Sequence, residues 1–272
     1  MLTAIKSMLP KPMRTGLRKC QSLAIRLFSN PMVPPKEAIF VGDSDFVATG
    51  NEFLRHFVEL GGLQPTDHVL DVGSGQGRMA LPLTRYLDAN SKYVGIEIVR
   101  HGVTWCQEKY RRFPNFQFVH ADIFNKAFNR DGAKKRSEYQ FPFRDASFDF
   151  VFLTSVFTHM GPEEMQHYLA EISRCMRVGG RCLITCFLLN PESMALIQAG
   201  RSTLHFDHEV FSFCRTINPD NFEQAIAFPE SFIRESFTRN GLHVKVTRYG
   251  RWVPRENFLS YQDIIVAEKR AA

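Results

Sequence analysis

The chain has 272 residues, 44% of them hydrophobic and 23% charged, which suits one large globular domain or one domain with an appendage. Its formal net charge of +6 is concentrated in residues 1–36, which hold seven Lys or Arg and no Asp or Glu, so the remainder carries −1. A near-neutral body argues against nucleic acid as a partner, because such proteins present a basic face.

The composition also bears on location and on metals. No stretch reaches the roughly 20 apolar residues that cross a bilayer, and the N-terminus lacks the apolar core of a secretory signal. The six cysteines form no C-x-x-C pair and no regular framework, so neither disulfides nor a zinc site are expected. We therefore expect a reducing, cytoplasmic location.

The start of the chain differs from the rest. Residues 14–28, "RTGLRKCQSLAIRLF", place apolar side chains at helical spacing and arginines largely on other faces, which predicts a basic amphipathic helix. Three interpretations stay open: a solvated arm, a peripheral membrane contact through residues 1–30, and an organelle transit peptide. The prolines of "NPMVPP" then stop the helix, so we expect an arm over 1–35 and the main domain over 36–272.

Beyond the arm, helical and strand patterns alternate along the chain. A strand followed by a helix, repeated several times, predicts an α/β fold with a doubly wound, mostly parallel sheet and helices on both faces. The last two strands lack a helix between them, so one of them should run antiparallel. We expect helices at 52–60, 78–87, 103–112, 162–176 and 230–239, and strands at 69–72, 93–98, 116–120, 148–153, 180–188, 243–248 and 262–267.

Two connections do not fit the alternation. Residues 124–140 are a polar insertion, and the segment at about 190–228 is too long for a simple loop. The second segment is rich in phenylalanine, which indicates either core filling or the apolar wall of a pocket. We expect it to be a cap over the substrate.

Three glycines lie between the first strand and the following helix, in "HVLDVGSGQGRMALPLTRYL" (68–87). Bare main chain there, beside the unpaired N–H groups of a helix start, is typical of a nucleotide-like ligand site. The spacing Gly73, Gly75, Gly77 is not that of a dinucleotide fold, which needs a small residue where Arg78 stands, and the Gly-Lys-Ser/Thr of a phosphate loop is missing. Glu97 ends the second strand, where a carboxylate can accept hydrogen bonds from ribose hydroxyls.

The motifs "VLDVGSGQGR", "GIEI", "HADIF", "FPFRDASFDFVFLTSVFTHM" and "YLAEISRCMRVGGRCLITCF" follow one another in the chain. In this order they resemble the class I S-adenosylmethionine-dependent methyltransferases, especially the small-molecule type called type 11. The resemblance covers about residues 52–190. It implies S-adenosylmethionine as cofactor, S-adenosylhomocysteine as product, and a seven-stranded Rossmann-like sheet with an antiparallel last strand.

The resemblance also implies roles for single residues. It assigns the methionine portion of the cofactor to the glycine loop, ribose and adenine to the second strand end, adenine to the third, and a cofactor-facing position to the fourth. "FVATG" (46–50) lies where such enzymes often place a segment over the cofactor. The implied cofactor residues are Asp71, Gly73, Ser74, Gly75, Gly77, Glu97, Ile98, Asp122, Ile123 and Thr154.

A methyl acceptor with a high pKa would also need a general base. His159 in "SVFTHM" is the first candidate, because it follows the fourth strand at the cofactor edge; a capping or packing role is the alternative. His205 and His208, with Asp207 between them in "LHFDHEV", are weaker candidates. Three such residues without a fourth partner do not predict a metal site.

The stretch after the fourth strand also narrows the acceptor. "LTSVF" lacks the Asn/Asp/Ser-Pro-Pro-aromatic motif of base amino-methylating enzymes and the cysteine needed for cytosine carbon methylation. We therefore expect in-line methyl transfer to a small or amphiphilic, lipid-like acceptor, with oxygen ahead of nitrogen or carbon. A nicotinamide oxidoreductase and a non-catalytic binding protein on the same fold remain as alternatives, and the oligomeric state is left open.

Overall fold

The computed structural model describes residues 30–40, 42 and 44–271. Nearly all of the expected arm, residues 1–29, lies outside the described residues, so its three interpretations stay predictions. Residues 30–42 include one 3-10 turn, η1 (Lys36–Ala38). From Ser44 onward the chain forms a separate compact unit that contains the sheet and the expected site.

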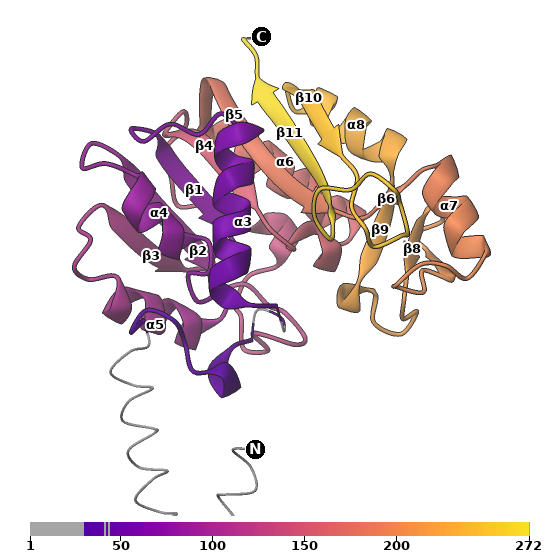
Figure 1. Cartoon of the computed structure of the whole chain (residues 1–272), viewed down its shortest axis with the longest axis horizontal. Coiled ribbons are helices and arrows are strands. Elements are labelled where there is room, and N and C mark those ends of the chain that lie inside the picture. Colours follow the sequence, from indigo (N-terminus) through magenta and orange to yellow (C-terminus); the bar gives the residue numbers. More distant parts are fainter. Residues whose placement is uncertain (1–29, 41, 43, 272) are drawn as a thin grey trace, which may run out of the picture. The chain divides into compact units, whose positions relative to one another are not determined.

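Seven strands form one sheet in the order β10-β11-β5-β4-β1-β2-β3 (Figure 1). The neighbours among β1 to β5 pair in parallel, whereas β11 runs antiparallel to both β5 and β10. The predicted Rossmann-like sheet with an antiparallel last strand is thereby confirmed. Its strands are β1 (His68–Val72), β2 (Lys92–Glu97), β3 (Phe116–His120), β4 (Phe148–Leu153), β5 (Met176–Cys186), β10 (Leu242–Arg248) and β11 (Asp263–Lys269).

Helices cover both faces of the sheet, because successive side chains of a strand point to opposite faces. On one face, the rings of Phe150 and Phe152 in β4 lie 5.7 and 4.3 Å from the ring of Phe57 in α3. The alternate residues, Val151 and Leu153, belong to the core cluster that includes the apolar side of α6. The helices are α3 (Phe46–Glu59), α4 (Ala80–Tyr86), α5 (Arg100–Lys109), α6 (Pro162–Cys175) and α8 (Glu230–Arg239).

Several element boundaries differ from the prediction. Helix α3 begins at Phe46 rather than at residue 52, because the Asp45 carboxylate caps it by accepting the N–H of Ala48 at 2.7 Å. The segment "FVATG" is therefore the first turn of a helix. Strand β5 begins at Met176 rather than at Gly180, since α6 passes into the strand without a turn and the pairing with β4 shifts register there.

The segment expected to be a cap has secondary structure of its own. A second sheet has the order β6-β9-β8-β7, and helix α7 precedes β7 in the chain (Figure 1). A separate apolar cluster supports it, in which Phe187 and Phe206 pack edge-on against Trp252. The elements are β6 (Leu188–Leu189), α7 (Pro191–Gln198), β7 (His208–Val210), β8 (Cys214–Thr216) and β9 (Ile226–Pro229).

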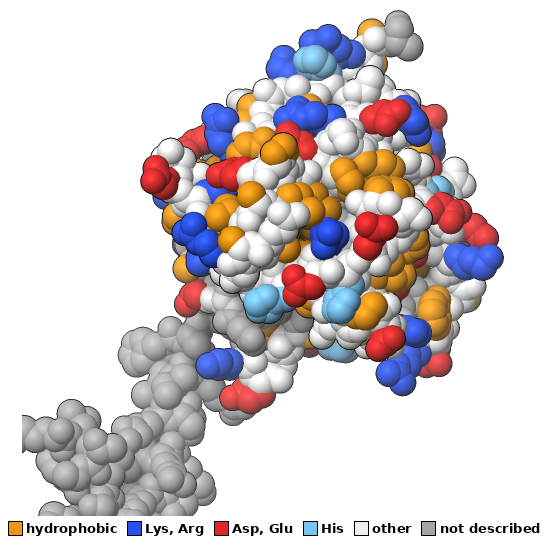
Figure 2. All heavy atoms as spheres, turned by 90° about the vertical axis from the view of Figure 1, so that its right-hand side faces the viewer, with side chains coloured by type: hydrophobic (Ala, Val, Ile, Leu, Met, Phe, Trp, Pro, Cys, Tyr) orange, Lys and Arg blue, Asp and Glu red, His pale blue; other side chains and the backbone are white. Residues whose placement is uncertain are grey.

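The phenylalanines of the cap divide between core and surface. Phe206 and Phe228 are fully buried, whereas Phe211 and Phe213 at the β7–β8 turn are 43% and 41% exposed. The face of the molecule that carries the cap shows apolar patches between charged side chains (Figure 2). None of the helices in the described part of the chain is long and apolar enough to span a membrane.

Candidate active site

The glycine loop after β1 is held against the end of β2. Gly73, Gly75 and Gly77 have φ of +83°, +54° and +82°, a region that side chains with a Cβ rarely adopt. The N–H groups of Gly73 and Ser74 both donate to the carbonyl of Ile96, at 2.8 and 3.1 Å. These two hydrogen bonds fix the main chain of the glycine loop against the end of β2.

The turn after β4 closes over the same loop. A Cβ placed on Gly73 would lie 2.5 Å from Cγ2 of Val156, which is closer than real Cβ contacts. Thr154, which precedes this turn, is half-buried, and Ser155 has φ +62°. Since the carboxyl ends of parallel strands share one edge of the sheet, β1 and β4 bring these two segments together at the edge where such folds bind ligands.

Glu97 ties the end of β2 to the glycine loop. Its carboxylate accepts the N–H of Gly75 at 2.7 Å and the N–H of Val99 at 2.8 Å. Burial raises the pKa of Glu97, while these main-chain donors act in the opposite direction. The N–H of Ile98 also acts on this carboxylate. Since a carboxylate can accept about four hydrogen bonds, capacity remains for a further donor.

Asp71 and Ser74 supply buried polar atoms that lack a partner within the described residues. The Asp71 carboxylate accepts the hydroxyl of Tyr93 at 2.6 Å, but its Oδ1 has no hydrogen bond, and neither has Oγ of Ser74. Burial raises the pKa of Asp71 to about 8. Buried polar atoms without partners are rare. Their position beside bare main chain fits a polar ligand such as the methionine end of the predicted cofactor.

The other predicted cofactor residues follow β2 and β3. Ile98 and Asp122 are half-buried at these strand ends. Ile123 is 1% exposed and belongs to the main core cluster, so its side chain faces the interior in this structure. Together with the loop and Glu97, the strand ends form one continuous edge from β4 to β3 (Figure 1).

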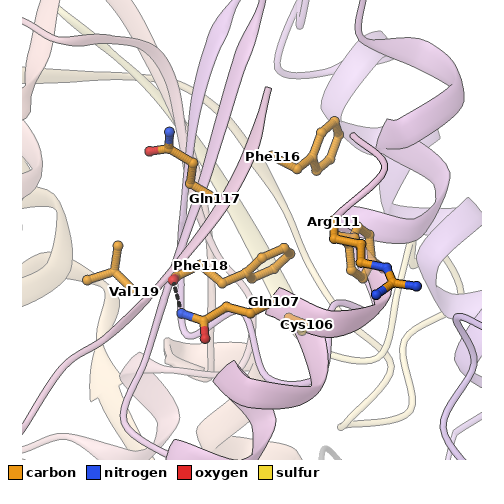
Figure 3. A pocket seen from close by; sticks show the side chains of 8 residues that line it. Cys106, Gln107, Arg111, Phe116, Gln117, Phe118 and Val119 are labelled. Atoms are coloured by element: carbon orange, nitrogen blue, oxygen red, sulfur yellow. Dashed lines mark hydrogen bonds between the residues drawn. The ribbon is translucent and has the colours of Figure 1, made fainter. Parts of the chain in front are cut away.

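Helix α5 and the residue after it contact the carbonyl groups of the glycine loop. A cavity of about 350 Å³ lies between α5 and β3 (Figure 3). The Tyr110 hydroxyl donates to the carbonyl of Gly77 at 2.8 Å, and Cys106 Sγ lies 3.7 Å from the carbonyl of Gly75. In Figure 3 the Gln107 amide is joined to the carbonyl of Phe118. None of the predicted site residues lines this cavity, so it is separate from the expected ligand edge.

His159 lies on η3 (Phe157–His159), directly after the turn that contacts the glycine loop. Its Nδ1 is 2.7 Å from the main-chain carbonyl of Glu223 in the cap. A carbonyl only accepts, so Nδ1 carries the hydrogen and Nε2 keeps a lone pair. Burial lowers the pKa of His159, which keeps the ring neutral near pH 7.

The other two histidines are placed differently. His205 is exposed in the loop before β7, and His208 is exposed at the first position of β7, opposite Thr216 of β8. Among residues 30–40, 42 and 44–271 no group of three His, Cys, Asp or Glu is arranged to hold a metal ion.

Two sets of polar residues at this edge were not predicted from the sequence. Thr185 accepts the N–H of Ser155 at 2.8 Å and donates to Gln262, whose amide donates to the Ser155 hydroxyl, each at 2.6 Å. Arg136, from the insertion between β3 and β4, is buried between carboxylates of α6 and of the cap. Neither set has a local pattern, because each joins residues far apart in the chain.

The fold and the site geometry agree with a comparison of sequences. Residues 70–184 match the family Methyltransf_11, described as a methyltransferase domain. This match, the seven-stranded sheet and the glycine loop agree with the class I S-adenosylmethionine-dependent methyltransferases, which the sequence motifs resemble. The cofactor of that class is S-adenosylmethionine.

One relative matches about half of this chain. The chain is 30% identical over 134 residues to 27-O-demethylrifamycin SV methyltransferase of Amycolatopsis mediterranei, a match that covers 49% of this chain and 43% of that protein. The chain thus matches less than half the length of this relative.

Two solved structures share the fold. A SAM-dependent methyltransferase from Methanosarcina mazei is 19% identical, with a TM-score of 0.55 over 79% of this chain and 98% of that one. The 1,6-didemethyltoxoflavin-N1-methyltransferase of Burkholderia thailandensis, solved with bound 1,6-didemethyltoxoflavin and S-adenosylhomocysteine, is also 19% identical, with a TM-score of 0.52 over 84% and 80% of the chains. At this identity the likeness concerns the fold.

Proposed function

We propose that this protein transfers a methyl group from S-adenosylmethionine to an oxygen of a small or amphiphilic acceptor, with His159 as general base. The observation that carries the proposal is the hydrogen bond from Nδ1 of His159 to the Glu223 carbonyl, 2.7 Å long, at the edge where the β4 turn contacts Gly73. That bond leaves Nε2 able to accept a proton from a hydroxyl.

The proposed cofactor site is the edge formed by the ends of β1, β2 and β3. The free Oδ1 of Asp71 and the main chain of the glycine loop would meet the polar methionine end, and Glu97 would accept ribose hydroxyls with its remaining lone pairs. Ile98, Asp122 and the main chain of Ile123 would surround the adenine, and Thr154 would face the reacting group. When bound, the cofactor supplies a methyl group on a sulfonium, which already has a good leaving group.

The chain's own residues then have three tasks. The glycine loop and Glu97 fix the position of one reactant, and the cap holds the other, so that proximity and orientation lower the barrier. His159 Nε2 takes the proton that an acceptor hydroxyl loses as its oxygen forms the new bond to carbon. A neutral ring is needed for this, and the burial of His159, which lowers its pKa, favours the neutral form.

The cap supports an acceptor with an apolar portion. Phe211 packs edge-on against Phe222 with ring centroids 5.0 Å apart, and a Cβ on Gly161 would lie 3.2 Å from the Phe211 ring. Gly161 follows His159 by two residues, so this aromatic pair lies close to the proposed base. Phe211 also has φ +55°, a conformation that costs energy for a side chain with a Cβ and clusters at functional sites.

Two similar proteins support the proposal of a small-molecule acceptor. One is a methyltransferase of 27-O-demethylrifamycin SV, and the other is a methyltransferase of 1,6-didemethyltoxoflavin. We further propose a cytoplasmic location, which agrees with the five described cysteines being buried and unpaired. The arm at 1–35 would add a peripheral membrane contact that brings a lipid-like acceptor to the 36–272 domain.

The test is a screen of small-molecule extracts with S-adenosylmethionine labelled at the methyl group, followed by identification of the labelled product. The proposal expects a label on oxygen; a label on nitrogen or carbon would contradict the choice of oxygen. Calorimetric titration with S-adenosylhomocysteine and with NAD separates methyl transfer from a nicotinamide enzyme. Failure to bind S-adenosylhomocysteine would contradict the whole assignment.

A further inference from the structure

We propose that Arg136 is a positioning residue for His159: it holds Glu223 of the cap against the η3 turn, so that the Glu223 carbonyl fixes the imidazole with Nε2 unprotonated. The inference rests on the function proposed above, because it concerns the same base. It assigns a role to the insertion between β3 and β4, which the cofactor edge does not use.

Arg136 is the point where three segments of the chain meet. Its side chain is 5% exposed, although it belongs to a stretch that reads as polar and solvated. Nη1 lies 2.8 Å from Oε2 of Glu164 in α6 and 3.1 Å from the carbonyl of His159, and Nη2 lies 3.1 Å from Oε1 of Glu223. The planar fork of a guanidinium can make these contacts together, which a lysine ammonium cannot reproduce.

Both carboxylates have second partners that hold them in place. Oε2 of Glu164 also accepts the N–H of Gly161 at the start of α6, at 2.8 Å. Oε2 of Glu223 accepts the side-chain amide of Asn125 at 3.3 Å, so the insertion holds Glu223 twice. The side chains of Glu164 and Glu223 are only 24% and 19% exposed. Without Arg136, two poorly hydrated negative charges would face each other.

The consequence for His159 follows from the position of its partner. Glu223 presents its side chain to Arg136 and its main-chain carbonyl to Nδ1 of His159, so a displacement of Glu223 breaks both contacts. Among the described residues, the charged groups that act on the pKa of His159 are Arg136 from the insertion, which lowers it, and Glu223 from the cap, which raises it. Once Glu223 moves away, the ring gains water and can take up either neutral tautomer.

The experiment is nuclear magnetic resonance of the full-length protein with ¹⁵N-labelled histidine, in which Nδ1 and Nε2 report protonation separately. His159→Gln identifies the His159 signals among the nine histidines. In the wild type we expect Nδ1 protonated, Nε2 unprotonated and a titration midpoint below 6.5. In Arg136→Gln we expect a mixture of tautomers and a midpoint shifted upward, toward that of an exposed histidine.

Three further variants make the result decisive. Arg136→Lys keeps the positive charge and should fold even where Arg136→Gln does not. It should shift the tautomer ratio and the titration midpoint of His159 in the same direction as Arg136→Gln, by a smaller amount. Adding Glu223→Gln to Arg136→Gln removes the repulsion and should restore part of the wild-type tautomer. Arg174→Gln removes a comparable ion pair of α6, with Glu171 and Asp145, and should leave the His159 signals unchanged.

The proposal is overturned if both Arg136 variants keep the wild-type tautomer and midpoint, or if Arg174→Gln shifts them as much as Arg136→Gln does. No methyl acceptor enters this measurement. A failure to detect methyl transfer therefore counts against the proposed function, and an unchanged His159 in the Arg136 variants counts against the positioning role.

Discussion

Gly73→Ala tests the geometry on which the cofactor edge depends. The new Cβ would lie 2.5 Å from Cγ2 of Val156, and the residue would also have to keep φ +83°. The backbone conformation alone costs on the order of 1–3 kcal/mol for a residue with a Cβ. The contact adds to that cost, because the turn after β4 must move to relieve it.

Gly179→Ala is the matched control. It has nearly the same backbone conformation, φ +79°, but no atom lies within 4 Å of the added Cβ. Both variants should lose stability in urea denaturation, roughly 1–3 kcal/mol for Gly179→Ala and more for Gly73→Ala. Combining Gly73→Ala with Val156→Ala removes Cγ2, and the double-mutant cycle should return a coupling of about 1 kcal/mol.

The decisive assay is calorimetric titration with S-adenosylhomocysteine. Gly179→Ala should bind as the wild type does, whereas Gly73→Ala should bind at least about tenfold more weakly, since displacement of the loop costs the ligand its main-chain partners, at roughly 1.4 kcal/mol for each factor of ten. Wild-type affinity in Gly73→Ala would refute the placement of the cofactor on this loop.

Four other changes test neighbouring parts of the site. Glu97→Gln should weaken S-adenosylhomocysteine binding in the same titration, because an amide offers fewer acceptor sites to ribose and to the N–H groups of Gly75 and Val99; unchanged affinity would contradict the ribose assignment. Burial raises the pKa of Asp71 to about 8 in the folded protein, above its unfolded value near 3.8. The folded state therefore holds the proton more tightly than the unfolded state. The contribution of Asp71 to the free energy of unfolding is lost as the pH rises from about 4 to 8. Asp71→Asn should therefore gain stability relative to the wild type at pH 8 more than at pH 5 in urea denaturation, and equal differences at the two pH values would disprove the raised pKa. His159→Gln should lower kcat by about 10²- to 10⁴-fold with the acceptor found in the extract screen and abolish an acidic limb below pH 6.5; a limb that persists would assign it to another group. Deleting residues 1–29 should reduce binding to anionic liposomes, and unchanged binding in a flotation assay would remove the proposed membrane role of the arm.

The sequence could predict which strand ends form the candidate edge, because the signals there are local. The three glycines, Asp71 and Glu97 each lie at a strand end that periodicity alone identifies, and parallel strands bring their carboxyl ends together. Even there, the sequence did not show that Glu97 already holds the N–H of Gly75, a contact between residues 22 positions apart.

The contacts of Arg136 could not be predicted in the same way. Arg136 is 87 residues from Glu223 and 28 from Glu164, and an arginine in a polar stretch looks the same whether it is solvated or buried. The start of α3 was missed for a different reason, since Asp45 caps a first turn whose apolar pattern is interrupted by Thr49 and Gly50. Tertiary contacts decide the structure at such positions, and local propensity decides it only where that propensity is strong.

The order of segments along the chain separates the proposed cofactor site from the proposed acceptor site. The glycine loop, Glu97 and Asp122 all precede β4, whereas the second sheet is inserted into the crossover between β5 and β10. Under the proposed function, exchange of residues 188–229 between homologous genes alters the substrate range and leaves the proposed cofactor site unchanged. Such a chimera would have to inherit the insertion as well, because the grafted Glu223 is anchored by Asn125 and Arg136.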